Sequence, residues 1–356
     1  MTIQQTIIQL SREFGTATFV RGGGGNTSCK DEQELWVKPS GTTLPELTSE
    51  ALIAIDRQRL SELYTAEPPQ DSAGRESFVS RLIQQAMLPD ASGRASVETP
   101  LHDSLQARYV VHTHPAFVNG LTSSKNGKEA AENLFPEALW IDYVDPGYTL
   151  CMHVRMKIEE YRHDFGNDPG IILLKNHGVV VAGDTPEEIR AIYSELQRNL
   201  EAQYEQAGIS TELEIGVLPE DGYVDASKEL IRGAMPDSSP YIDACGAFDF
   251  ATGPITPDHI VYSKSFPFVG EPNSGSVKEF KAKHGYLPQV IAFNGAVFGV
   301  GDSAKSASLA LELAQDGALV KKLAGAFGGI NYMSDRAREF IENWEVESYR
   351  KKQLDK

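Results

Sequence analysis

The stretch Val110-Val111-His112-Thr113-His114-Pro115 places two imidazoles two residues apart inside an apolar run. In an extended strand, side chains at positions i and i+2 point to the same face. His112 and His114 are therefore expected to project together, with Thr113 on the opposite face. Two neutral imidazoles one pleat apart form half of a tetrahedral metal site. A pair of surface histidines on an edge strand is the alternative, because short motifs carry many false positives.

Two further features of the sequence favour a metal site. A carboxylate, Glu98, lies upstream of the histidine pair, and a third histidine, His177, follows the apolar run Ile171–Leu174. Three histidine ligands leave one open position on Zn²⁺, as a catalytic site requires. A nearby carboxylate that need not stay bound can then move protons. This combination predicts abstraction of a proton next to a carbonyl, with the metal holding the resulting enediolate.

The composition restricts the class of protein. At 356 residues, with 41% hydrophobic and 23% charged residues, the chain has an ordinary globular composition and room for two domains. Its net charge of −17 disfavours binding to nucleic acid or to an anionic membrane. The three cysteines lack paired spacing, which fits a reducing compartment. Because no apolar stretch reaches the ~20 residues that span a bilayer, and the N-terminus has no signal-peptide pattern, we expect a cytoplasmic protein.

Strands and helices alternate with short connections along the first 207 residues, which predicts an α/β fold with a mixed β-sheet flanked by helices. Strands are expected near 35–37, 51–56, 109–112, 171–175 and 179–182, and helices near 3–14, 73–87, 99–105, 117–121, 127–134, 151–161 and 185–207. The last helix has Thr185 as its expected N-cap and Pro186 at its first position.

The remainder of the chain predicts a linker and a second domain. Residues 208–239 are interrupted by proline, glycine and serine, as linkers are. A small C-terminal α/β domain is expected over 240–356. Its predicted strands are His259–Ser263, Gln289–Phe293 and Ala296–Val300, and its predicted helices are Ser303–Leu323 and Ser334–Lys351. The predicted division is thus 1–207, 208–239 and 240–356.

A glycine-rich turn in the second domain resembles a dinucleotide fingerprint. Gly299-Val300-Gly301-Asp302-Ser303-Ala304 follows a strand and opens a helix. A dinucleotide site also needs a second strand that ends in an acidic residue about twenty positions later, and here a helix runs into further glycines. We therefore expect Asp302 or Ser303 to cap the helix, and no nicotinamide cofactor.

Five short motifs in the first 207 residues resemble, in order and spacing, the class II aldolase and adducin family, which includes fuculose-phosphate and rhamnulose-phosphate aldolases. They are Gly25-Asn26-Thr27-Ser28, Pro39-Ser40-Gly41, Ser96-Val97-Glu98, Val111-His112-Thr113-His114-Pro115 and Asn176-His177-Gly178-Val179-Val180. The resemblance implies a mixed sheet wrapped by helices, zinc bound by His112, His114 and His177, and cyclic tetramers with active sites at subunit interfaces. Adducin-type relatives lack the metal histidines, so this chain is expected to be an enzyme.

The same resemblance implies roles for individual residues. Glu98 would be the catalytic base that binds zinc at rest and leaves it to take a proton; family epimerases tend to carry aspartate there, which disfavours epimerisation. Tyr143 would donate a proton in a neighbouring subunit's site. Tyr148 is an alternative donor, and a packed structural tyrosine is an equal alternative for both. His102 is expected to be a packed histidine.

A glycine run lets backbone N–H groups approach an anion closely. By resemblance, the substrate phosphate would be bound by Gly25, Asn26, Ser40, Gly41 and Ser96. Relatives often carry two polar residues before the glutamate, whereas this chain has Ser96-Val97. One phosphate donor is thus missing, so a substrate with a non-phosphorylated or differently placed anion remains an alternative.

The predicted function is a lyase of carbohydrate metabolism. It would be a zinc-dependent class II aldolase, or one using another divalent transition metal, that cleaves a ketose 1-phosphate of the rhamnulose or fuculose type to dihydroxyacetone phosphate and an aldehyde. The alternatives are a decarboxylase, dehydratase or epimerase of a sugar or sugar-acid phosphate, and a non-catalytic adducin-like scaffold. The expected partners are a small-molecule sugar phosphate and further copies of the chain, a tetramer being favoured, with no nucleic acid and no membrane.

Three stretches of the tail carry a narrower resemblance. They are Ile255–Lys264, Gly299-Val300-Gly301 and Phe340–Glu347, and they resemble the middle region of bacterial fusions between a rhamnulose-phosphate aldolase and a short-chain alcohol dehydrogenase. The chain is accordingly expected to correspond to the aldolase part of such fusions.

Overall fold

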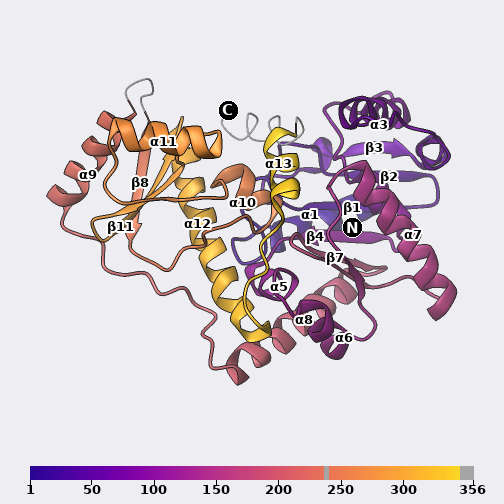
Figure 1. Cartoon of the computed structure of the whole chain (residues 1–356). Helices are drawn as coiled ribbons and strands as arrows, with labels where there is room; N and C mark the ends of the chain where they lie inside the picture. The colour runs from indigo at the N-terminus through magenta and orange to yellow at the C-terminus, as the bar shows by residue number, and fades with distance from the viewer. Residues whose placement is uncertain (236–239, 345–356) are drawn as a thin grey trace. The chain divides into compact units, whose positions relative to one another are not determined.

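The computed structural model describes residues 1–235 and 240–344 (Figure 1). The chain divides into two compact units. Unit 1 comprises Met1–Val118 and Lys128–Leu200, and unit 2 comprises Asn119–Gly127 and Glu201–Lys356. Each unit contains one β-sheet with helices packed on it. The predicted fold class, a mixed sheet flanked by helices together with a smaller second sheet, is confirmed.

Unit 1 is built on a seven-stranded sheet with the strand order β3-β2-β1-β4-β7-β6-β5. Neighbouring strands are antiparallel except for β5 and β6, which are parallel. The strands are β1 (Asn26–Lys30), β2 (Glu34–Val37), β3 (Ile53–Asp56), β4 (Tyr109–Thr113), β5 (Leu139–Ile141), β6 (Ile171–Leu174) and β7 (Gly178–Gly183).

This topology brings distant segments to one end of the sheet. Because β4 is antiparallel to both β1 and β7, its carboxyl end lies beside the amino ends of those two strands. The carboxyl ends of β2, β5 and β6 lie at the same end, since each of these strands runs in the direction of β4. All the site residues predicted from the sequence lie on the segments that enter or leave the sheet there, apart from Ser96 and Glu98. These two precede α4 and are tied in by a bridge between Pro39 and Ala95.

Two helix pairs cover the two faces of this sheet. On one face α4 (Thr99–Ser104) and α7 (Tyr148–Phe165) bury an apolar core that includes Val110 of β4. On the other face lie α1 (Ile3–Glu13) and α8 (Pro186–Gln206). Ser11 of α1 contacts Thr27 at 2.7 Å between hydroxyl oxygens, and Tyr193 of α8 contacts Thr113 at 2.7 Å. His112 and Thr113 therefore face opposite sides, as strand alternation requires.

The remaining elements of the first 200 residues are short or peripheral. They are η1 (Ser49–Ala51), α2 (Arg57–Leu60), η2 (Ser61–Tyr64), α3 (Ser72–Ala86), α5 (Ala116–Thr122) and α6 (Gly127–Leu134). The predicted N-cap of α8 is confirmed, because the Thr185 hydroxyl accepts the Glu188 N–H at 3.2 Å.

Unit 2 is built on a four-stranded sheet with the strand order β8-β11-β10-β9. Its strands are β8 (Tyr241–Gly246), β9 (Phe268–Val269), β10 (Val290–Phe293) and β11 (Ala296–Gly301), and its helices are α9 (Asp221–Ala234), α10 (Pro257–Tyr262), α11 (Ser274–His284), α12 (Ala304–Ala324), η3 (Gly325–Phe327) and α13 (Asp335–Asn343). Helices α9 and α11 share one apolar cluster with the sheet, and α12 shares another on the opposite face (Figure 1).

Several sequence expectations for unit 2 are corrected. The strand predicted over His259–Ser263 is wrong, because these residues belong to α10 and its C-cap. Pro257 has a fixed φ and no N–H, which suits the first turn of a helix; all six residues of α10 are buried, so the amphipathic signature of a helix is missing. The range 208–239, expected as a linker, contains α9.

Other expectations for the same region are met in part. Ser303 caps α12 in a capping box, as expected. The last predicted helix begins as expected, but α13 ends at Asn343 and Trp344 is extended. The rest of that predicted helix, from Glu345 to Lys351, lies outside the described residues.

Candidate metal centre

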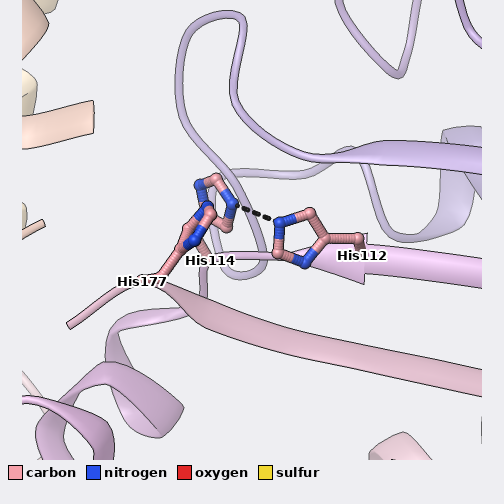
Figure 2. A group of neighbouring side chains, drawn as sticks. All are labelled: His112, His114 and His177. Carbon is pink, nitrogen blue, oxygen red and sulfur yellow. Dashed lines mark hydrogen bonds between the residues drawn. The ribbon is translucent and has the colours of Figure 1, made fainter. Parts of the chain in front are cut away.

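Three buried histidines converge where β4 ends and β7 begins. His112 is the fourth residue of β4, His114 follows the strand, and His177 immediately precedes β7. One ring nitrogen from each lies within 4.8 Å of the other two. Figure 2 shows the three rings gathered together, with His112 and His114 joined by a contact of 3.0 Å between their Nε2 atoms. The structure thus brings together the three histidines that the sequence singles out.

The backbone around His177 is shaped so that its ring reaches the other two. Asn176 adopts a left-handed conformation, with φ of 53°, and turns the chain tightly between β6 and β7; asparagine is among the few non-glycine residues that tolerate this. Gly178 then passes very close to β4. A Cβ atom there would lie 2.4 Å from the Thr113 carbonyl oxygen and 2.6 Å from His114 Cδ2. Only glycine allows this approach.

The hydrogen bonds of His112 prepare it as a ligand. Its Nδ1 lies 2.9 Å from the carbonyl oxygen of Val179. A carbonyl can only accept, so Nδ1 carries the proton and Nε2 presents its lone pair to the cluster. Nitrogens bound to one tetrahedral zinc at ~2.0–2.1 Å lie about 3.4 Å apart. The imidazole spacing and the orientation of His112 therefore fit a single divalent cation.

Glu98 supplies the nearby carboxylate. It precedes α4, is 5% exposed, and does not cap the helix through its side chain. Its Oε1 lies 3.7 Å from Nε2 of His112 and 3.7 Å from Nε2 of His177. A carboxylate at this distance is not in hydrogen-bond contact with the rings, but it borders the space that they enclose. Glu98 is thus close enough to contact a cation or a substrate bound between the rings.

A second histidine environment, not anticipated from the sequence, adjoins Glu98. The Asn26 side chain donates through Nδ2 to Glu98 Oε2, and its Oδ1 contacts Nε2 of His102. Nδ1 of His102 lies 2.7 Å from the Ser28 hydroxyl. His102 is buried, as expected of a packed histidine, but both of its ring nitrogens have polar partners. The spacing Glu98-x-x-x-His102 on one helix face was the available signal.

The predicted anion-binding residues lie around the same end of the sheet. Gly25 has φ of +67°, and a Cβ atom there would lie 2.7 Å from the His112 carbonyl oxygen. Ser40 donates its N–H to the Arg94 carbonyl at 2.8 Å, and Gly41 has φ of +87°. Ser96 accepts the Glu98 N–H at 3.2 Å. Their role in binding a phosphate stays a prediction.

The two candidate proton donors occupy different environments. Tyr143 follows β5 by two residues and is partly exposed. Since Ile141 of β5 pairs in parallel with Leu174 of β6, Tyr143 leaves the sheet at the end where His177 lies. Tyr148 begins α7 and packs in an apolar cluster, where burial raises the pKa of its hydroxyl. The position of Tyr143 suits a proton donor better than that of Tyr148, and the role of Tyr143 stays a prediction.

The arrangement has a defined chemical capacity. Three imidazoles can hold a Lewis acid while leaving a coordination position open, and an adjacent buried carboxylate can exchange protons with whatever occupies that position. Such a combination of groups can support proton transfer at a carbon next to a carbonyl.

Comparison with known proteins identifies the family of the first two hundred residues. Residues 5–204 match the family model described as the Class II Aldolase and Adducin N-terminal domain. One curated relative, the uncharacterized oxidoreductase YuxG of Bacillus subtilis, is 26% identical over 281 residues, which are 70% of this chain and 39% of that protein. The chain thus spans about two fifths of the length of this relative.

Two solved structures illustrate the similarity of this chain to known proteins. The N-terminal class II aldolase domain of a conserved protein from Thermoplasma acidophilum is 23% identical with a TM-score of 0.47, covering 55% of this chain and 91% of that chain. The L-fuculose-1-phosphate aldolase of Thermus thermophilus is 16% identical with a TM-score of 0.39. The match covers 58% of this chain and 95% of that chain. None of the helices in residues 1–235 and 240–344 has the length and apolar character needed to cross a membrane.

Proposed function

Since this chain belongs to the class II aldolase and adducin family, we propose that it is a divalent-metal-dependent lyase that cleaves a ketose 1-phosphate of the rhamnulose or fuculose type. The products would be dihydroxyacetone phosphate and an aldehyde. The observation that carries the proposal is the convergence of His112, His114 and His177 beside the buried carboxylate of Glu98. A non-catalytic scaffold would have no use for such a set of groups.

The three histidines would hold the cation, and zinc is the metal that we propose. Imidazole nitrogens suit zinc, although iron, cobalt and nickel accept the same ligands. When bound, the metal supplies a Lewis acid that polarises the substrate carbonyl and stabilises negative charge beside it.

We assign to Glu98 the transfer of the proton to and from C3, the substrate carbon next to the carbonyl. In cleavage the C3–C4 bond breaks, its electron pair stays with the fragment that contains C3, and Glu98, starting as a protonated carboxyl, gives its proton to C3 and becomes the carboxylate. In the synthetic direction the same carboxylate removes that proton. In the synthetic direction we assign Tyr143 of a neighbouring subunit as the donor, whose hydroxyl proton goes to the aldehyde oxygen that becomes the C4 hydroxyl. In cleavage the resulting phenolate takes the C4 hydroxyl proton back as the aldehyde forms. Homo-oligomers, tetramers in particular, belong to this proposal, and light scattering of the purified protein tests them.

The substrate phosphate is assigned to Gly25, Asn26, Ser40, Gly41 and Ser96. Left-handed glycines at positions 25 and 41 support the assignment, because such turns direct backbone N–H groups toward an anion. The amide of Asn26 has two N–H bonds. One goes to Glu98, and we assign the second to the phosphate.

The test is a cleavage screen of the zinc-loaded protein against a panel of ketose 1-phosphates that includes L-rhamnulose 1-phosphate and L-fuculose 1-phosphate. Release of dihydroxyacetone phosphate is measured with a coupled reductase. We expect at least one substrate to be cleaved by the wild type and not by Glu98→Gln. Absence of cleavage across the panel, with metal bound, would contradict the proposal.

A decarboxylase or dehydratase of a sugar acid or its phosphate is the second candidate. The apolar Val97 beside Glu98 favours it, since this position adds no side-chain donor for a phosphate. Adding sugar acids and sugar-acid phosphates to the panel, and measuring carbon dioxide and 2-keto products, separates the two candidates.

A further inference from the structure

Two short sequence patterns face each other beside the metal centre. On β1, Asn26 and Ser28 are two residues apart, so that both side chains point to one face of the strand. Glu98, the N-cap residue of α4, and His102 within the helix are four residues apart, so that both lie on one side of the helix. All four residues are buried. The strand and the helix together therefore form a polar chain, Ser28–His102–Asn26–Glu98, inside unit 1.

The chemistry of the end groups fixes the direction of every hydrogen bond in this chain. Glu98 can only accept as a carboxylate, so the Asn26 atom that contacts it is the donor Nδ2. The carbonyl oxygen of Asn26 then faces His102 Nε2, which must carry a proton in order to donate. His102 Nδ1 is left as an acceptor and receives the Ser28 hydroxyl proton at 2.7 Å. Each donor points toward Glu98.

Burial lowers the pKa of His102 to about 3, and the neighbouring His112 acts in the same direction. The imidazole is therefore neutral at ordinary pH, in agreement with one donor and one acceptor nitrogen. A neutral ring in this tautomer can orient the Asn26 amide in only one way, because the reversed amide would place N–H against N–H and oxygen against the carboxylate.

We propose that His102 is a positioning residue which, through Asn26, holds Oε2 of Glu98 and thereby leaves Oε1 directed at the space between His112 and His177. The proposal rests on the assignment of Glu98 as the catalytic carboxylate. It differs from a packing role, which an apolar side chain of similar size would fill equally well. Aligned hydrogen bonds of this kind also strengthen one another in a low-dielectric interior.

The first test needs no substrate. In the full-length protein labelled with ¹⁵N-histidine, the signal that disappears in His102→Gln identifies His102. We expect the neutral Nε2–H tautomer from pH 6 to pH 9. Crystal structures of His102→Phe and His102→Gln then report Glu98 directly. In the first variant we expect Glu98 Oε2 to leave Asn26, and in the second, where the Gln amide N–H can replace the imidazole N–H, we expect it to stay.

The second test is kinetic and uses the ketose 1-phosphate that the wild type cleaves. Loss of a group that orients a metal-site residue typically costs about 10–100-fold in activity. We expect His102→Phe to lower kcat within this range with KM little changed, and His102→Gln to recover most of kcat. Metal content measured for each variant shows that the cation is retained.

The outcomes separate this proposal from the proposed function. An Nδ1–H tautomer, an unmoved Glu98 in His102→Phe, or equal kcat in His102→Phe and wild type would each overturn the positioning role. Failure of the wild type to cleave any ketose 1-phosphate would overturn the lyase assignment alone, because the tautomer and the position of Glu98 would still be read without substrate.

Discussion

Both units bury histidines, and the partners of those histidines differ. In unit 1, His112, His114 and His177 direct ring nitrogens toward one another within 4.8 Å. In unit 2, His259 is equally buried, but its Nδ1 lies 2.7 Å from the Thr256 hydroxyl and its Nε2 lies 3.2 Å from a carboxylate oxygen of Asp316. Convergence of ring nitrogens, rather than burial, is what distinguishes a candidate ligand set from a histidine that joins elements of the fold.

In each unit a glycine allows the backbone to pass close to one of these buried histidines. Gly178 lets β7 pass beside His114 at the candidate metal centre. Gly317 lets α12 pass beside His259 of α10, where an added Cβ would lie 3.1 Å from His259 Cδ2. The first approach helps to assemble the cluster of three histidines, whereas the second joins two helices of unit 2. Changes in the two clusters should therefore affect different properties of the protein.

The largest expected effect is on turnover. Glu98→Gln keeps the shape of the side chain and its contact with Asn26 through the amide, but it removes the base, and loss of a general base typically costs ~10²–10⁴ in rate. We expect this loss with unchanged metal content, measured as steady-state cleavage of the best ketose 1-phosphate. The matched control is Glu187→Gln, an exposed position in the first turn of α8, which should leave the rate unaltered. Near-normal turnover of Glu98→Gln would move the base to another residue, with Tyr143 first.

A combined effect on stability and metal binding is expected for Gly178→Ala. The new methyl group would overlap the Thr113 carbonyl and His114, and overpacking of this kind typically costs about 1–3 kcal/mol. Because the displaced group is a proposed ligand, metal content should fall as well. Chemical denaturation and elemental analysis measure the two effects. A variant with wild-type stability and metal content would show that the backbone approach is not needed.

Stability alone should change for Asp316→Ala in unit 2. Removing the carboxylate takes away the charged group that lies 3.2 Å from Nε2 of buried His259, and losing one member of a buried polar contact costs about 1–3 kcal/mol. Metal content and turnover should match the wild type. Asp249→Ala, which removes an exposed partner of Lys321, is the control and should cost at most about 1 kcal/mol. Loss of metal in Asp316→Ala would contradict the separation of the two clusters.

The smallest expected effect is a gain. Gly233 lies in helix α9 with open space around the position of an added Cβ. Gly233→Ala should therefore stabilise the protein by about 0.4–1 kcal/mol, mainly by restricting the unfolded chain. The same glycine-to-alanine substitution should thus lower the free energy of unfolding at position 178 and raise it at position 233. Destabilisation of Gly233→Ala in a denaturant titration would contradict this contrast.

Local sequence patterns sufficed to predict much of unit 1. Strand alternation placed His112 and His114 on one face, and helix signals located α8 with its Thr185 cap. Their positions in the sequence added Glu98 and His177 to the set, and the family resemblance, which the match over residues 5–204 confirms, then suggested roles for these residues. Unit 2 was harder, because its buried helix α10 has no exposed face and the segment before α9 is rich in turn-forming residues.

The polar chain behind Glu98 could not be predicted, because it depends on the pairing of β1 with α4. Asn26 and His102 are 76 residues apart in sequence and meet only in the folded protein. The tautomer of His102 follows from Asn26, whose amide is oriented by Glu98, and no local pattern encodes such a combination. In the same way, the identity of the substrate depends on groups beyond the motifs.

The central claim is that His112, His114 and His177 bind one divalent cation that the reaction needs. Elemental analysis of the purified wild type, beside a His112→Ala, His114→Ala, His177→Ala triple variant, tests it most directly. We predict about one equivalent of a transition metal per chain, most of it zinc, in the wild type, and a background level in the variant, with activity lost in chelator and restored by the metal. Equal metal content in the two proteins, or full activity of the metal-free wild type, would contradict the claim.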